Sequence, residues 1–201
     1  MKLILFSGFL GSGKTTSILS AAAYIMRNAK KQNPLVILEN EVGDIAYDDS
    51  LIQSGGLEVR NLLSGCICCT LNTSLIGELI EIEKQYAPEF VIFEPTGVAF
   101  PQRILDSVSA CITKLEWSTV ITVVDALRLP KLMKILPNLI EEQIAAANTI
   151  LISKTDLISE SQANEAVETV RGINPKADIH KPPFEISAND ALWEEVLGNN
   201  D

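Results

Sequence analysis

The segment that most restricts the fold is residues 8–15, which read Gly-Phe-Leu-Gly-Ser-Gly-Lys-Thr and fit the pattern G-x-x-x-x-G-K-[ST]. An apolar run, residues 3–6, precedes it directly. Glycines at this spacing let backbone N–H groups turn inward around phosphates, the lysine reaches the β and γ oxygens, and the last hydroxyl can bind Mg²⁺. The pattern therefore predicts a strand, a phosphate-binding loop and a helix, in that order.

This loop supplies most of the nucleotide contacts that we expect. A glycine-rich turn of purely structural use is the alternative, and the agreement of strand, loop and helix speaks against it. Lys14 is the predicted catalytic cation, and the Thr15 hydroxyl is predicted to bind Mg²⁺. The predicted phosphate-binding residues are Gly8, Gly11, Ser12, Gly13, Lys14, Thr15 and Thr16.

Composition favours an α/β fold and excludes two classes of partner. Hydrophobic residues make up 47% of the 201 positions but aromatic residues only 5%, the aliphatic bias expected of parallel strands buried on both faces. The formal net charge of −10 argues against binding to nucleic acid or to an anionic membrane, because no basic stripe is present to neutralise phosphates. We expect one domain over residues 1–201.

Strands alternate with helices along the whole chain. Pro130 and Pro137 interrupt the helical stretch that leads to Ala147. The pattern predicts a mainly parallel sheet flanked by helices, the architecture of P-loop nucleoside triphosphatases. The later strands are expected at 35–38, 57–63, 90–93, 119–125, 149–152 and 184–188, with a short helix at 48–54.

Carboxylates follow two of these strands. Glu39, Glu41 and Asp44 come after residues 35–38, and Glu94 ends the strand at 90–93. Ligands of open α/β sheets bind at the carboxyl ends of strands. Glu94 occupies the place of the carboxylate that holds the Mg²⁺ shell, and Glu41 and Asp44 are predicted to touch Mg²⁺, a transferred metal or the attacking water. A solvated acidic loop is the alternative for these residues.

Residues 153–156 read Ser-Lys-Thr-Asp and resemble the [NT]-K-x-D sequence of GTP-binding domains. In that motif the aspartate accepts hydrogen bonds from guanine N1–H and N2–H₂, and the lysine stem covers the ring. Asp156 would therefore select guanine, with Ser153 and Lys154 beside it. Solvated loop charges are the alternative. Residues 186–188 resemble the companion motif whose backbone N–H meets guanine O6, which adds Ser187 and Ala188 to the predicted nucleotide site.

Three cysteines are crowded together behind Gly65, at Cys66, Cys68 and Cys69. Their thiolates can converge on one soft or borderline ion, with Zn²⁺ first and Co²⁺ or Ni²⁺ as further choices. Three thiols leave a fourth position open to water, to Glu41 or to a partner protein, which suits metal transfer. Small buried hydrophobic residues and a Cys66/Cys69 redox pair are the alternatives.

The remaining metal-binding residue types receive no role. Cys111 stands alone in a predicted helix and is expected in the core, while the lone histidine, His180, is expected at the surface. Four cysteines with three in one loop form no disulfide framework, which favours a reducing compartment, the cytoplasm.

Taken together, five segments resemble the CobW-like GTPases, metallochaperones related to the nickel-insertion GTPases of urease and hydrogenase. The resemblance implies GTP hydrolysis coupled to delivery of a metal to a client protein, and a homodimer that forms with nucleotide. Many members continue through a His-rich linker into a second domain, and this chain resembles the GTPase domain alone. The segments are residues 8–15, 40–43, 65–69, 94–97 and 153–156.

The predicted function is a GTPase that switches between metal-holding and metal-releasing states. No arginine finger is identifiable in the sequence, so slow intrinsic turnover is expected. One rival is a P-loop kinase or ATPase that acts on a small molecule. The other is a non-catalytic, nucleotide-dependent interaction module whose cysteines hold structural zinc.

Overall fold

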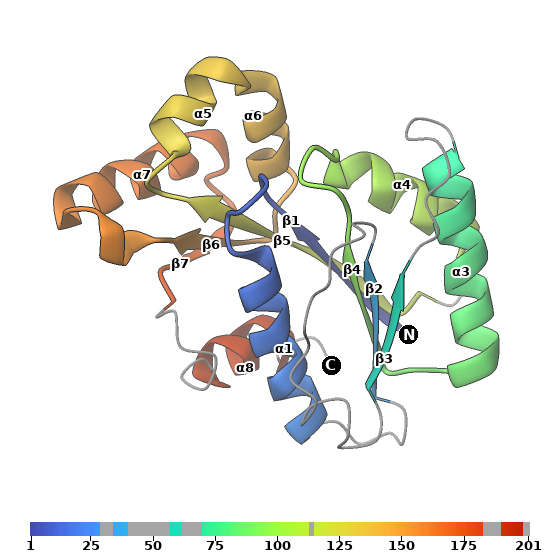
Figure 1. The fold of residues 1–201 in the computed structure, drawn as a ribbon. Helices are drawn as coiled ribbons and strands as arrows, with labels where there is room; N and C mark the ends of the chain where they lie inside the picture. Colours follow the sequence, from blue (N-terminus) through green and yellow to red (C-terminus); the bar gives the residue numbers. More distant parts are fainter. Residues whose placement is uncertain (29–33, 40–56, 62–69, 113–114, 183–189, 199–201) are drawn as a thin grey trace.

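The fold is a parallel sheet whose first strand lies at its centre (Figure 1). The structure, a computed structural model, describes residues 1–28, 34–39, 57–61, 70–112, 115–182 and 190–198. Seven strands follow the order β3-β2-β4-β1-β5-β6-β7, and every pair of neighbours is parallel. The strands are β1 (Lys2–Ser7), β2 (Leu35–Glu39), β3 (Leu57–Asn61), β4 (Phe90–Glu94), β5 (Trp117–Asp125), β6 (Thr149–Ser153) and β7 (Asp178–His180). The mainly parallel α/β fold expected from the sequence is thus confirmed.

Helices cover both faces of this sheet, and the apolar runs of the strands are buried between them. Along β1, Leu3 and Leu5 join the core under one face, whereas Ile4 and Phe6 join the core under the other. Such alternation of two cores is the reason why the strand reads as a continuous apolar run. The helices are α1 (Lys14–Asn28), α3 (Thr70–Tyr86), α4 (Pro101–Cys111), α5 (Leu129–Ile135), α6 (Pro137–Ala145), α7 (Glu160–Ile173) and α8 (Asp190–Gly198), with the short 3₁₀ helix η1 (Thr155–Leu157).

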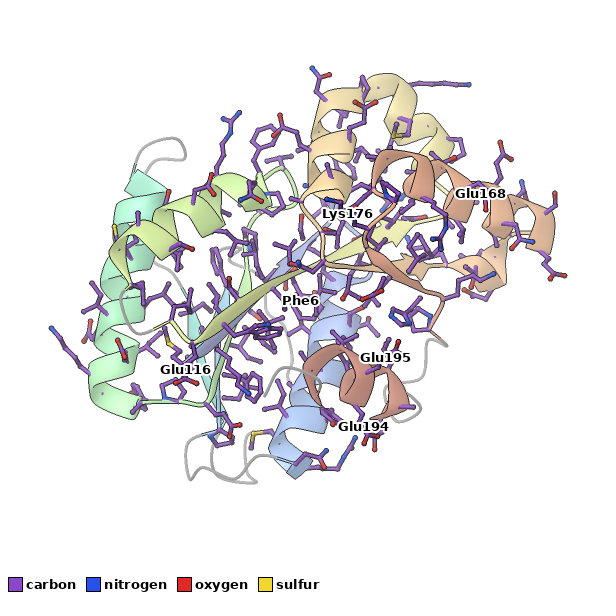
Figure 2. All side chains as sticks on the ribbon, turned by 180° about the vertical axis from the view of Figure 1, so that it is seen from behind. Phe6, Glu116, Glu168, Lys176, Glu194 and Glu195 are labelled. Carbon is purple, nitrogen blue, oxygen red and sulfur yellow. The ribbon has the colours of Figure 1, made fainter. Side chains whose placement is uncertain are left out.

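The smaller core is closed by α1 and α8, which lie side by side when the molecule is seen from behind (Figure 2). Trp193 of α8 is 1% exposed, and its ring meets Phe6 edge-on with centroids 6.2 Å apart. The indole N–H of Trp193 donates to the hydroxyl of Ser20 on α1 at 2.8 Å, so the buried polar group is satisfied. The larger core lies under α3, α4, α5, α6 and α7.

Local sequence rules account for the helix boundaries. Pro130 and Pro137 each stand in the first turn of a helix, where a missing N–H costs no hydrogen bond, so the predicted interrupted helix is two helices. Ser159 and Gln162 form a capping box at the start of α7. Within the described ranges, no helix has both the length and the apolar character needed to cross a membrane.

Some expectations differ from the structure, and others lie outside the described residues. Strand β7, residues 178–180, adds an edge strand that the sequence did not predict, and the predicted strand at 184–188 and helix at 48–54 fall outside the described residues. Cys111 is exposed, so its predicted core position was wrong: it ends α4, whose buried face carries Ile104 and Val108. His180, expected at the surface, lies half-buried on β7.

Candidate nucleotide-binding site

The candidate site lies along one edge of the sheet, where the parallel strands all end. The segment after β1 forms the phosphate loop, and it leads into α1 as expected (Figure 1). Charged or polar residues end the other strands: Glu39 on β2, Glu94 on β4, Asp125 on β5 and Ser153 on β6. This edge is where open α/β sheets bind ligands.

The glycines of the phosphate loop adopt conformations that other residues rarely reach. Gly8, Gly11 and Gly13 have φ angles of 134°, 68° and 101°. A Cβ atom at Gly8 would lie 2.3 Å from the carbonyl oxygen of Val123 on β5, so a side chain has no space there. The close approach to the sheet requires glycine at position 8, and the positive φ angles favour glycine at all three positions.

Lys14 and Glu94 meet at the start of α1. The Lys14 ammonium lies 3.6 Å from a carboxylate oxygen of Glu94, and the two side chains are only 5% and 9% exposed. Thr15 and Thr16 follow on the first turn of α1, both half-buried. The arrangement places one buried cation and one buried anion at the end of the loop.

A second buried carboxylate, Glu39, lies next to Glu94. The two residues are paired in register between β2 and β4. Burial, followed by the negative charge of Glu94, raises the pKa of Glu39 to about 7. One of its oxygens is buried without a hydrogen-bond partner among the described residues. Glu39 is therefore a carboxyl group that gains or loses a proton near neutral pH.

Ser153, the last residue of β6, contacts the phosphate loop directly. The Ser153 hydroxyl donates to the backbone carbonyl of Ser12 at 2.7 Å, with the Val124 carbonyl at 3.2 Å. Lys154 adopts a left-handed conformation with φ of 58°, and Asp156 in η1 is exposed. Serine in place of the usual asparagine thus still braces the phosphate loop against β6.

Asp125 anchors this part of the site, and its side chain is 1% exposed. It accepts hydrogen bonds from the Lys154 ammonium at 2.6 Å, from the Arg128 guanidinium at 2.5 Å and from the Arg128 backbone N–H at 3.0 Å. Burial alone would raise the pKa of Asp125, but the hydrogen bonds from Lys154 and Arg128 outweigh burial and lower it. Asp125 is therefore an ionised anchor.

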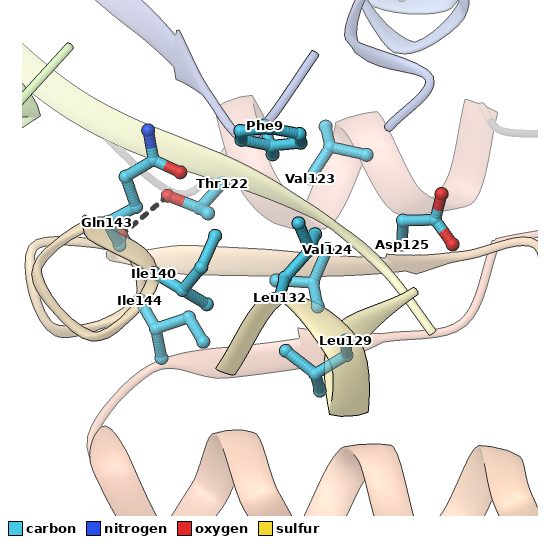
Figure 3. A pocket seen from close by; sticks show the side chains of 10 residues that line it. All are labelled: Phe9, Thr122, Val123, Val124, Asp125, Leu129, Leu132, Ile140, Gln143 and Ile144. Carbon is cyan, nitrogen blue, oxygen red and sulfur yellow. Dashed lines mark hydrogen bonds between the residues drawn. The ribbon is translucent and has the colours of Figure 1, made fainter. Parts of the chain in front are cut away.

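The loop after β4 approaches the phosphate loop so closely that it requires a glycine. A Cβ at Gly97 would lie 2.7 Å from the backbone nitrogen of Leu10. Buried Gln143 on α6 holds this loop, because its side-chain amide donates to the carbonyls of Gly97 and Ala99, each at 3.1 Å. The Thr122 hydroxyl of β5 in turn donates to the Gln143 backbone carbonyl at 2.9 Å (Figure 3).

Several predicted residues lie outside the described part of the chain. Within the described ranges, no group of three or more metal-ligating side chains occurs. The predicted cysteine site lies outside these ranges. The roles predicted for these residues therefore stay predictions. They are Glu41, Asp44, Cys66, Cys68, Cys69, Ser187 and Ala188.

The structure adds residues to which the sequence analysis assigned no role. Asp125 ends a buried strand, as Glu94 does, and that position was the available signal. Arg128 follows three residues later, on no recognised motif, and only its contacts reveal it. Gln143 lies in α6 among apolar residues at helical spacing, and nothing in that pattern distinguishes it.

Comparison with known proteins agrees with this geometry. Residues 2–181 match the family model described as CobW/HypB/UreG, nucleotide-binding domain. The chain is 31% identical to the Escherichia coli protein named zinc chaperone YeiR over 76% of its own length and 46% of that protein. It is 32% identical to zinc-regulated GTPase metalloprotein activator 1 of Schizosaccharomyces pombe over 87% of its own length and 44% of that protein. The chain thus spans about half the length of the curated relatives that it matches.

Solved structures support the fold. The zinc-bound YjiA GTPase of Escherichia coli aligns over 90% of this chain and 57% of its own, with a TM-score of 0.65 and 22% identity. The hydrogenase maturation factor HypB of Archaeoglobus fulgidus aligns over 100% of this chain and 91% of its own, with a TM-score of 0.66 and 16% identity. At these identities the likeness concerns the fold alone.

Proposed function

This chain belongs to the CobW/HypB/UreG nucleotide-binding domain family, and on that premise we propose that it is a GTP-binding and GTP-hydrolysing metallochaperone. The observation that carries the proposal is the hydrogen bond from Ser153 to Ser12, which joins the guanine-type loop to the phosphate loop. The two loops that recognise the two ends of GTP are thereby held in one unit. We propose that residues 1–201 act as one GTPase domain.

Guanine selection rests on Asp156 and on the stem of Lys154. Asp156 is exposed at the sheet edge and can accept from guanine N1–H and N2–H₂, whereas adenine offers no matching donor pair. The Lys154 ammonium is held by Asp125, which fixes the stem that would cover the base. Ser187 and Ala188 complete this part of the proposal.

The residues present fit Mg²⁺ bound with GTP. The Thr15 hydroxyl and the Glu94 carboxylate are oxygen donors of the kind that Mg²⁺ prefers, and both lie at the end of the phosphate loop. When bound, Mg²⁺ neutralises charge on the β and γ phosphates. Lys14 supplies a further positive charge to the same oxygens, and Glu41 or Asp44 orients the attacking water.

The cargo is a transition metal, held by Cys66, Cys68 and Cys69. Relatives that carry the name zinc chaperone support Zn²⁺ as the first choice, with Co²⁺ and Ni²⁺ as further choices. The partners are a metal-dependent client protein and a second copy of the chain in the nucleotide-bound state.

The test combines nucleotide competition with metal analysis. Protein purified without oxygen is titrated with GTP, xanthosine triphosphate and ATP, and its metal content is measured with and without a GTP analogue. GTP should outcompete ATP, Asp156→Asn should shift the preference toward xanthosine triphosphate, and Lys14→Ala should lose binding or turnover. The metal content should depend on the analogue.

Two outcomes would overturn the proposal. Equal competition by ATP in the parent protein would favour a small-molecule kinase or ATPase. Zinc that is stoichiometric and indifferent to nucleotide would favour an interaction module with a structural metal site.

A further inference from the structure

Arg128 lies where the base-binding loop and the phosphate loop meet. It precedes α5 as the N-cap residue, and its side chain is 37% exposed. One guanidinium nitrogen donates to Asp125 at 2.5 Å, and another donates to the backbone carbonyl of Leu10 in the phosphate loop at 2.8 Å. A single planar side chain therefore joins the end of β5 to the middle of the loop.

The contact with the loop extends beyond one hydrogen bond. A Cβ placed on Gly11 would lie 3.5 Å from the terminal guanidinium nitrogen of Arg128, and the guanidinium carbon lies 5.9 Å from the centre of the Phe9 ring. Arg128 therefore lies close to three consecutive loop residues, Phe9, Leu10 and Gly11. The backbone N–H groups of such a loop are the groups that surround phosphates, so their positions depend on what holds the loop.

Asp125 connects Arg128 to the base-binding side. The same carboxylate oxygen accepts from Arg128 and from Lys154, and the Asp125 side chain is almost fully buried. Charge-assisted hydrogen bonds of this kind are short and directional. Movement of the Lys154 segment or of the phosphate loop would therefore disturb the shared carboxylate.

We propose that Arg128 is a positioning residue, which holds the phosphate loop in its binding shape through Leu10 and ties it to Lys154 through Asp125. The inference rests on the proposed function and adds the component that aligns the two ends of the nucleotide. Arg128 acts on phosphate through the loop backbone, and contact between its own charge and the nucleotide plays no part.

The test compares nucleotides that differ in phosphate number. Dissociation constants for GDP and GMP are measured by competition with a fluorescent GDP, for the parent, Arg128→Gln, Arg128→Lys and Asp125→Asn. Arg128→Gln should weaken GDP about tenfold, the effect of losing one charge-assisted hydrogen bond, and should weaken GMP much less. Asp125→Asn weakens the hold on Lys154 as well as on Arg128, so it should weaken both GDP and GMP.

Lysine separates positioning from simple charge. A lysine keeps the positive charge, but its single ammonium cannot reproduce the planar fork that reaches Asp125 and Leu10 together. Arg128→Lys should therefore bind GDP as weakly as Arg128→Gln. The matched control is Arg171→Gln on the exposed side of α7, which should leave both affinities unchanged.

The outcomes distinguish this inference from the proposed function. Full GDP affinity in Arg128→Lys would show that charge is sufficient, and an equal loss for GDP and GMP in Arg128→Gln would indicate general loosening; either result overturns the inference. Thermal unfolding of every variant checks that the fold is intact. A parent protein that binds no guanine nucleotide would overturn the proposed function itself.

Discussion

At the scale of single residues, the unusual feature is a pair of carboxyl groups buried side by side. Glu39 and Glu94 end neighbouring strands, and among the described residues Glu94 is the one of the two that is paired with a cation, Lys14 at 3.6 Å. The pKa of Glu39 is raised to about 7 by burial and by Glu94, so at low pH its proton relieves the repulsion. Folding therefore favours the protonated form of Glu39.

This pairing predicts a pH-dependent stability. The folded pKa of Glu39, about 7, exceeds the unfolded value of 4.5, so the folded state binds this proton more tightly. The resulting contribution of Glu39 to the free energy of unfolding is fully present below pH 4.5 and is lost as the pH rises through 7. Glu39→Gln should unfold like the parent at pH 4.5 and should be about 1–3 kcal/mol more stable at pH 8. Urea unfolding of metal-free, nucleotide-free protein measures the difference.

The control for that experiment is Glu81→Gln, which removes an exposed carboxylate from α3. Its unfolding free energy should follow the parent at every pH. If the unfolding free energies of Glu39→Gln and the parent change in parallel from pH 4.5 to pH 8, the raised pKa assigned to Glu39 is contradicted.

At the scale of elements, α6 restrains the loop that follows β4. Gln143, 2% exposed, donates to the carbonyls of Gly97 and Ala99, and that loop passes against Leu10 of the phosphate loop. A change of the β4 loop is thereby linked to α6, which lies on the larger-core face of the sheet. The link requires an amide donor at position 143.

Removal of that donor should destabilise the protein. Gln143→Met keeps the side-chain volume but removes the amide that donates to the Gly97 and Ala99 carbonyls, so the unfolding free energy should fall by about 1–3 kcal/mol. Hydrogen exchange should rise for the amides of residues 96–99. Gln102→Met, at an exposed position of α4, is the control and should change neither quantity. Unchanged exchange at 96–99 would show that the loop is held by other contacts.

Much of the fold could be predicted because its strands are apolar runs separated by helical spacing. The phosphate-binding pattern likewise predicted a tight loop that contains the glycines at positions 8, 11 and 13, and all three have positive φ angles. Edge strand β7 could not be predicted, since three residues of which the first is exposed carry little hydrophobic pattern. The contacts of Asp125, with Arg128 nearby in sequence and Lys154 far away, arise from the order of strands in the sheet, which single-strand patterns do not contain.

At the scale of the whole molecule, the proposed cargo and nucleotide sites follow strands that lie close together in the sheet. The segment with Cys66, Cys68 and Cys69 follows β3, which pairs with β2, and β2 pairs with β4. The end of β3, after which the cysteine segment begins in the sequence, lies two strands away from the end of β4 at the same edge of the sheet. Binding of metal and of nucleotide should therefore influence each other.

Such coupling is reciprocal and is typically 1–3 kcal/mol. A GTP analogue should change metal affinity by about 5–150-fold relative to GDP, and metal should change GTP affinity by the same factor. Because thiolates must lose protons to bind, metal affinity should also fall below neutral pH. Metal titrations in three nucleotide states measure the effect, with the variant Cys66→Ser/Cys68→Ser/Cys69→Ser as the control that should lose metal. Identical affinities in all states would exclude the coupling.

The central position of β1 also governs how the chain reaches this structure. Its two neighbours in the sheet are β4 and β5, and the second of these ends only at Asp125. A ribosome adds about 5–20 residues per second, so the apolar first strand waits for several seconds before both partners exist. During that time the nascent chain exposes an unpaired, aggregation-prone segment, and long-range parallel pairing is intrinsically slow. The same placement that surrounds the phosphate loop with strand ends therefore leaves an apolar strand without both of its partners while the chain is being synthesised.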